Sequence, residues 1–151
     1  MKRLVGGGVA ALLPFTAWAA EPLWHKTCTK DGACFVEQFA LAQPKNVPVL
    51  HVGFDLQGGD GKARMVLTAP LGVLLAPGLR LTVDGAAPIV LPFERCGRQG
   101  CDASAVLDQT ARTRFEKGKT LMVRYAVSDK AAQDIPIKLD GLADALASLS
   151  K

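Results

Sequence analysis

Apolar residues recur at every second position through much of this chain, and this two-residue period most constrains its fold. In the segment 51–57, Val52, Phe54 and Leu56 alternate with polar or small residues. Successive side chains of a β-strand leave opposite faces, so this alternation indicates a strand with one buried face. The same pattern occurs in the segments 79–85, 120–127 and 135–139.

Turn residues separate these segments. The Gly-Gly-Asp-Gly segment 58–61 is predicted to form a loop tip, and Asp84-Gly85 to close a hairpin before the segment 88–93. Proline cannot donate to a strand ladder and is tolerated at strand ends. The prolines expected at such ends are Pro70, Pro77 and Pro88. Short strands spaced by turns in a chain of 151 residues predict a single all-β domain, a β-sandwich.

Two segments have helical periodicity. The segment 109–118 is predicted to form a short helix capped by Asp108, with Ala111 and Phe115 facing inward and Gly118 ending it.

A second helix is predicted over 141–150, close to the C-terminus. Leu142, Leu146 and Leu149 fall at helical spacing, and Asp140 is the expected N-cap. We expect this leucine stripe to cover a sheet; the alternative is a face for a partner.

The N-terminus has the pattern of a secretory signal peptide. Lys2-Arg3 precedes an apolar run over 4–15, followed by small residues at the positions that a signal peptidase requires. A run of about a dozen residues is too short for a bilayer, which needs roughly 20. We predict a signal peptide over 1–19 and a mature domain over 20–151, located in the periplasm or secreted.

The formal net charge is +4, and loss of the two signal-peptide cations leaves a charge too small to predict nucleic-acid binding. Catalytic patterns are also weak. His25 and His51 have no metal-ligand partner at helical spacing, and Ser104 and Ser128 lack the glycine setting of a nucleophile elbow. We therefore predict a protein that is not an enzyme and has no cofactor.

Four cysteines in an exported protein are expected to form disulfides. Asp-Gly and Gly-Arg-Gln-Gly turns favour the local pairs Cys28–Cys34 and Cys96–Cys101 over crossed pairings. Two alternatives remain for these residues. Arg95 and Arg98 would favour a thiolate at Cys96, so the second pair could carry thiol–disulfide chemistry. A four-cysteine zinc site is the other, although its first pair has five intervening residues instead of the usual two to four.

Basic residues are concentrated between positions 95 and 124. The residues predicted as a surface for an anionic partner are Arg95, Arg98, Arg112 and Arg114. The competing interpretation is an ordinary solvated face, because acidic residues are interspersed.

Several segments together carry a family resemblance. They are Trp24, the first cysteine pair, the segment PLGVLLAPGLRLTVDG, the segment PFERCGRQGCDA, EKGKTLMVRY and IPIKLDGLADAL. In these the mature chain resembles the invasion-associated locus B family of exported bacterial proteins. Lys138 and Leu142 depart from the family pattern, which usually has serine and phenylalanine there.

The resemblance implies an immunoglobulin-like β-sandwich, and the residue patterns add a short helix and a C-terminal helix to it. It also implies an envelope-associated or binding protein whose partner is an unknown protein or envelope component, with a role in host interaction or in the envelope. The cysteines transfer as structural bridges, and no catalytic residue transfers.

Overall fold

The structure is a computed structural model that describes residues 22–57 and 62–150. The predicted signal peptide at 1–19 and the predicted loop tip at 58–61 lie outside the described residues, and both stay predictions. The strands are β1 (His25–Cys28), β2 (Cys34–Ala42), β3 (Val47–Gln57), β4 (Lys62–Ala69), β5 (Leu79–Val83), β6 (Ile89–Leu91), β7 (Arg95–Gly97), β8 (Gly100–Leu107), β9 (Thr120–Ser128) and β10 (Ala131–Lys138). The helices are α1 (Gln109–Lys117) and α2 (Leu142–Ala147), and a 3-10 turn over Ser148–Ser150 follows α2.

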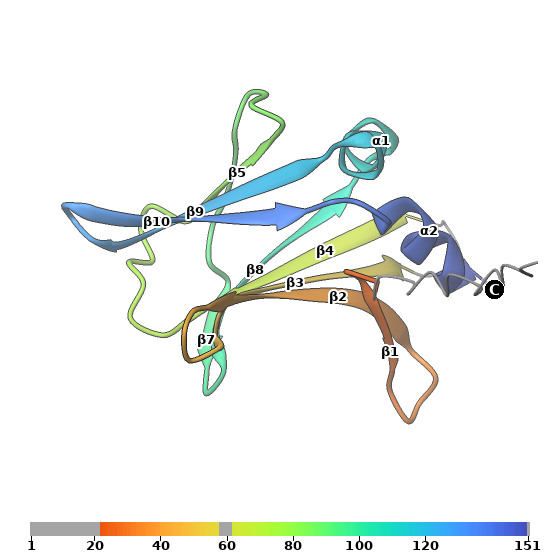
Figure 1. The fold of residues 1–151 in the computed structure, drawn as a ribbon, viewed down its shortest axis with the longest axis horizontal. Coiled ribbons are helices and arrows are strands. Elements are labelled where there is room, and N and C mark those ends of the chain that lie inside the picture. Colours follow the sequence, from red (N-terminus) through yellow and green to blue (C-terminus); the bar gives the residue numbers. More distant parts are fainter. Residues whose placement is uncertain (1–21, 58–61, 151) are drawn as a thin grey trace, which may run out of the picture.

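The strands form two antiparallel sheets. The larger sheet has six strands in the order β1-β2-β3-β4-β8-β7, and the smaller has four in the order β10-β9-β5-β6. Figure 1 shows the two sheets as layers, with α1 and α2 at one end and the β2–β3 turn and β7 toward the other. The predicted β-sandwich with a short helix and a C-terminal helix is therefore confirmed. Within the described part of the chain, neither helix is long and apolar enough to cross a membrane.

The core lies between the facing sides of the sheets, where the alternating residues of each strand meet. Val52 and Phe54 of β3 are buried, and so are the alternating apolar residues of β5. In β9 the alternation holds through Tyr125 but fails at Val127, which is 38% exposed. Val127 is the last residue but one of β9, and the end of the β9–β10 hairpin projects beyond the larger sheet (Figure 1).

An aromatic cluster closes the helical end of the sandwich. The ring of Phe54 makes edge contacts with Trp24 and with Phe115, at centroid distances of 5.5 and 5.9 Å. Edge-to-face pairs at such distances stabilise beyond the area that they bury, by about 0.5–1.5 kcal/mol each. The cluster joins the segment before β1, the larger sheet and α1.

Helix α1 begins as the sequence predicts. The Asp108 carboxylate accepts a hydrogen bond from the Ala111 amide at 2.7 Å, and Phe115 is buried. Gly118 ends the helix in an extended conformation, so glycine is not required there for a left-handed turn. It is required for space, because a Cβ atom at Gly118 would lie 2.6 Å from a Val83 methyl group.

The predicted cap of the C-terminal helix is wrong. The N-cap of α2 is Gly141 in a left-handed conformation with φ of 80°, and no side chain caps the helix. The chain enters α2 through a turn in which the Leu142 amide donates to the Leu139 carbonyl. Asp140 therefore lies one residue before the N-cap position. Leu142 and Leu146 are buried and Leu149 is partly buried against the core, which confirms the stripe as a cover for the sandwich.

A hydrogen bond also connects the two sheets. The ladder between β2 and β3 skips Val49, because Ala40 pairs with Leu50 and Leu41 with Pro48. The hydroxyl of Tyr125 in β9 donates to the carbonyl of Val49 at 3.0 Å. The bulge thus provides an acceptor for the opposite sheet, and burial raises the pKa of the Tyr125 phenol.

Asp84 and Gly85 form the predicted hairpin turn between β5 and β6. Both have positive φ, 48° and 74°, and the Ala86 amide donates to the Val83 carbonyl at 2.9 Å. The Asp84 carboxylate also accepts bonds from the amides of Lys119, at 3.0 and 3.2 Å, and of Thr120, at 2.9 Å. These backbone bonds lower the pKa of Asp84, and they fasten the turn to the start of β9.

The variant Asp84→Asn tests this connection, because asparagine tolerates a left-handed backbone but carries no charge. A group whose pKa is lowered by folding stabilises the protein above its unfolded pKa, near 3.8, and that stabilisation is lost as pH falls. We expect Asp84→Asn to lower the Tm at neutral pH and the difference to shrink below about pH 4. Thermal melts across this range check it, and a Tm difference that is constant with pH would contradict it.

Candidate functional site

The outer face of the six-stranded sheet carries the densest set of interacting polar and aromatic side chains. One row crosses the sheet from β2 to β7 and contains, in order, Phe39, His51, Thr68, Asp102 and Arg95. Directly opposed residues on one face of antiparallel strands are close enough for their side chains to interact. The row therefore forms a continuous strip across this face.

Asp102 holds together the β7 end of the strip. Its carboxylate accepts a hydrogen bond from the Thr68 hydroxyl at 2.8 Å and another from Arg95 Nε at 3.2 Å. In the next row, the Ser104 hydroxyl donates to Glu94 at 2.6 Å. The side chain of Arg95 is 81% exposed, so this ion pair orients the guanidinium more than it stabilises the fold.

His51 and Glu37 form the centre of the β2 end. His51 Nε2 lies 2.9 Å from Glu37 Oε2, and the Thr27 hydroxyl donates to the other Glu37 oxygen at 2.7 Å. The His51 ring stacks on Phe39 at a centroid distance of 4.5 Å. Gly53 lies beside this ring, and a Cβ there would make an ordinary van der Waals contact of 3.5 Å with His51 Cε1. His51 is thus hydrogen-bonded on this face, whereas His25 is exposed on β1.

A groove of about 670 Å³ opens over this end of the strip. Its walls are mainly apolar, and Phe39 and Leu71 remain 49% and 59% exposed. Arg98 and Gln99, at the tip of the β7–β8 hairpin, line one side. Exposed apolar side chains gathered around a concave surface are typical of interaction sites.

Both predicted disulfides are present, and each lies in an edge hairpin of the six-stranded sheet. Cys28 pairs with Cys34 across β1 and β2, and Cys96 with Cys101 across β7 and β8, with Cα separations of 4.0 and 3.9 Å. The local pairing is thus confirmed. The second bridge closes the hairpin that brings Arg98 to the groove.

The structure separates the four arginines that were predicted as an anionic-partner surface. Arg95 and Arg98 lie in the β7–β8 hairpin, and Arg112 and Arg114 lie on α1, at the other end of β8. The eight residues of β8 span about 25 Å. Arg112 is paired with Glu116 at 2.7 Å, whereas Arg98 and Arg114 make no ion pair with any described residue. Recognition of an anion by these residues stays a prediction, and it concerns two separate places.

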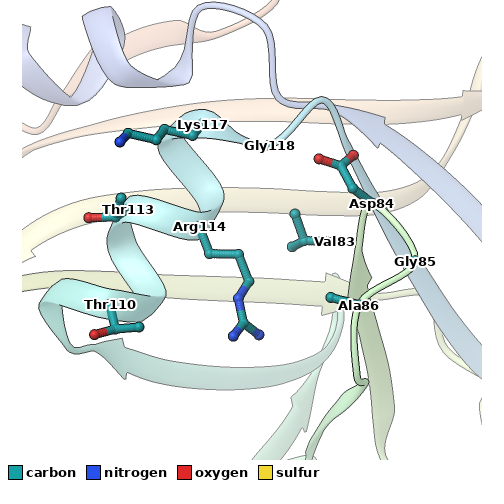
Figure 2. Close-up of a pocket in the computed structure, with 9 residues that line it drawn as sticks. All are labelled: Val83, Asp84, Gly85, Ala86, Thr110, Thr113, Arg114, Lys117 and Gly118. Carbon is teal, nitrogen blue, oxygen red and sulfur yellow. The ribbon is translucent and has the colours of Figure 1, made fainter.

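Arg114 lines a second cavity, of about 600 Å³, between α1 and the β5–β6 turn. Figure 2 shows its side chain extending along the gap between the helix and the strand, near Val83 and Ala86, whereas the Lys117 side chain points away. The Asp84 carboxylate, at the other edge, is already bonded to backbone amides. This cavity therefore presents a single cation.

The zinc alternative has no supporting geometry among the described residues, and the two serines considered from the sequence are engaged in hydrogen bonds. No three His, Cys, Asp or Glu side chains of residues 22–57 and 62–150 are grouped as metal ligands. Ser104 is bonded to Glu94, and Ser128 accepts a hydrogen bond from the Lys130 amide.

Sequence and fold comparisons give the same answer about the chain's relatives. Residues 24–150 match the family model described as Invasion associated locus B (IalB) protein. The chain belongs to this family. An Invasion protein B from Bartonella bacilliformis (strain ATCC 35685 / KC583 / Herrer 020/F12,63) is 26% identical to it over 136 residues, which cover 85% of this chain and 72% of that protein. The crystal structure of invasion associated protein b from Bartonella henselae matches with a TM-score of 0.77 and 25% identity, over 87% of this chain and 94% of that one.

IalB family membership confirms the resemblance and makes this an invasion-associated protein. Glu37, Phe39 and Leu71, which line the groove, are not among the residues that the sequence predicts. Segment 34–42 has apolar residues on both faces of β2, so its two-residue period is obscured. Only the spacing of Phe35, Glu37 and Phe39 would have indicated a shared face.

Replacing both cysteines of the second bridge by alanine, Cys96→Ala with Cys101→Ala, should destabilise the protein. The chain-entropy relation gives about 2 kcal/mol for so short a loop. The Cys28–Cys34 bridge closes a loop of similar length, so the matched double variant that removes it should lower the free energy of unfolding by a similar amount. Urea titrations of both variants measure this, and an unchanged unfolding midpoint for the Cys96 and Cys101 variant would contradict the structural role.

Proposed function

We propose that this IalB family protein is an exported, non-enzymatic binding protein that docks a protein partner in the groove on the outer face of its six-stranded sheet. The observation that carries the proposal is the exposure of Phe39 and Leu71 beside Arg98 on one concave surface. Protein interfaces are enriched in aromatic residues and arginine, and their central residues are surrounded by polar ones.

The polar side chains of the groove are held in place before any partner arrives. Glu37 is bonded to both His51 and Thr27, and the His51 ring is stacked on Phe39. Side chains that are already ordered lose less conformational entropy on binding. This supports a preformed recognition surface.

One observation and one prediction support export. Disulfides persist in oxidising compartments, and both bridges lie in exposed hairpins. The predicted signal peptide over 1–19 would direct the chain to the periplasm or beyond. The envelope is therefore where we expect the partner.

A photoreactive amino acid at Leu71, introduced into the full chain in cells, tests the proposal. Leu71 is 59% exposed, so the replacement should not disturb the fold. We expect irradiation to give a discrete crosslinked species in the envelope or periplasmic fraction. Phe39→Asp in the same chain should abolish this crosslink, because docking would bury the new carboxylate against the partner's apolar surface.

The matched control places the same photoreactive residue at Lys30, in the exposed β1–β2 turn of the same sheet. A crosslink that is equally strong from position 30, or that survives Phe39→Asp, would rule out the groove as the docking site. Recovery of the protein only from the cytoplasm would rule out export.

A further inference from the structure

The outer face of the smaller sheet contains an unusual pairing of charges. One row crosses its four strands and contains, in order, Val90, Arg80, Arg124 and Asp134. Two arginines are thus direct cross-strand neighbours on β5 and β9. Like charges directly opposite one another destabilise a sheet, so this arrangement needs a compensating interaction.

One carboxylate supplies only part of that compensation. Arg124 Nη1 lies 3.3 Å from Asp134 Oδ2, and the two side chains are 55% and 49% exposed. Arg80 is exposed and makes no ion pair within residues 22–57 and 62–150. A guanidinium has five donor hydrogens, so the pair retains most of its hydrogen-bonding capacity and one unit of uncompensated positive charge.

A hollow of about 430 Å³ lies over these residues. It is lined by Arg80, Thr82, Gly85, Met122, Arg124 and Asp134. Thr82 adds a hydroxyl, and Met122, its cross-strand neighbour, adds an apolar contact. The hollow thus combines two guanidinium groups, the Asp134 carboxylate that pairs with one of them, a hydroxyl and an apolar wall.

We propose that Arg80 and Arg124 together bind a tetrahedral oxyanion, the phosphate group of an ester, with the organic part of the ester against Met122. A carboxylate has two oxygens, which a single guanidinium can occupy in bidentate fashion. A phosphate has enough oxygens to accept hydrogen bonds from both arginines. Its double negative charge also relieves the repulsion between them.

The phosphate can come from a small soluble compound or from a lipid headgroup, and two probes distinguish these sources. Isothermal titration calorimetry with pyrophosphate at low salt measures the first. Flotation with vesicles of phosphatidylcholine, with and without phosphatidic acid, measures the second. Saturable pyrophosphate binding without vesicle association would assign the site to soluble phosphates, and association that requires phosphatidic acid would assign it to lipid.

Arg80→Gln is the diagnostic variant, and Lys30→Gln, in the β1–β2 turn of the other sheet, is its control with the same change of charge. We expect Arg80→Gln to weaken binding of the effective probe at least about tenfold and Lys30→Gln to leave it nearly unchanged. Because repulsion is removed, Arg80→Gln should not lower the Tm. Arg80→Lys keeps the charge but loses the paired donors of the guanidinium. It should therefore bind the probe more tightly than Arg80→Gln and more weakly than the unmodified protein.

Three results would overturn the inference. The first is failure of the unmodified protein to bind either probe. The second is equal weakening of binding by Arg80→Gln and Lys30→Gln. The third is undiminished binding by both Arg80 variants, Arg80→Lys and Arg80→Gln. The groove variant Phe39→Asp should bind the probe normally, since it lies on the other sheet. Loss of partner docking and loss of phosphate binding can therefore be told apart.

Discussion

The burial of alternate side chains between the two sheets determines which residues remain on the outside. Val52 and Phe54 in β3, with their counterparts in the smaller sheet, point into the core, so His51 must point outward. Contacts of Phe54 with Trp24 and Phe115 then close the helical end. The inner packing thus fixes the composition of both outer faces before any partner is considered.

The two outer faces differ in which side chains lie opposite one another on neighbouring strands. Across the larger sheet, neighbouring side chains satisfy one another, as Asp102 does with Thr68 and Arg95, and the exposed surface beside them is apolar. Across the smaller sheet, Arg80 faces Arg124 and repulsion is left partly uncompensated. Surfaces of the first kind suit protein contact and those of the second suit anions, which is why we assign the partner and the phosphate to opposite sides of the sandwich.

Local patterns in the sequence predicted most of the fold. Alternation identified β5 and β9, and Asp84-Gly85 identified the turn between β5 and β6, because these signals depend on neighbouring residues alone. The groove was not predicted, since it brings together Phe39, Leu71 and Arg98 from three separate parts of the chain. The register between strands decides which residues become neighbours, and no single segment contains that information.

Hydrogen–deuterium exchange most directly tests the claim that the larger sheet's outer face is the interaction surface. The purified protein would be measured alone and in complex with the partner obtained by crosslinking from position 71. We expect slower amide exchange in β2, in the first half of β3 and in the β7–β8 hairpin of the complex, with exchange in β9 and β10 unchanged. Protection confined to β9 and β10, or to α2, would contradict it.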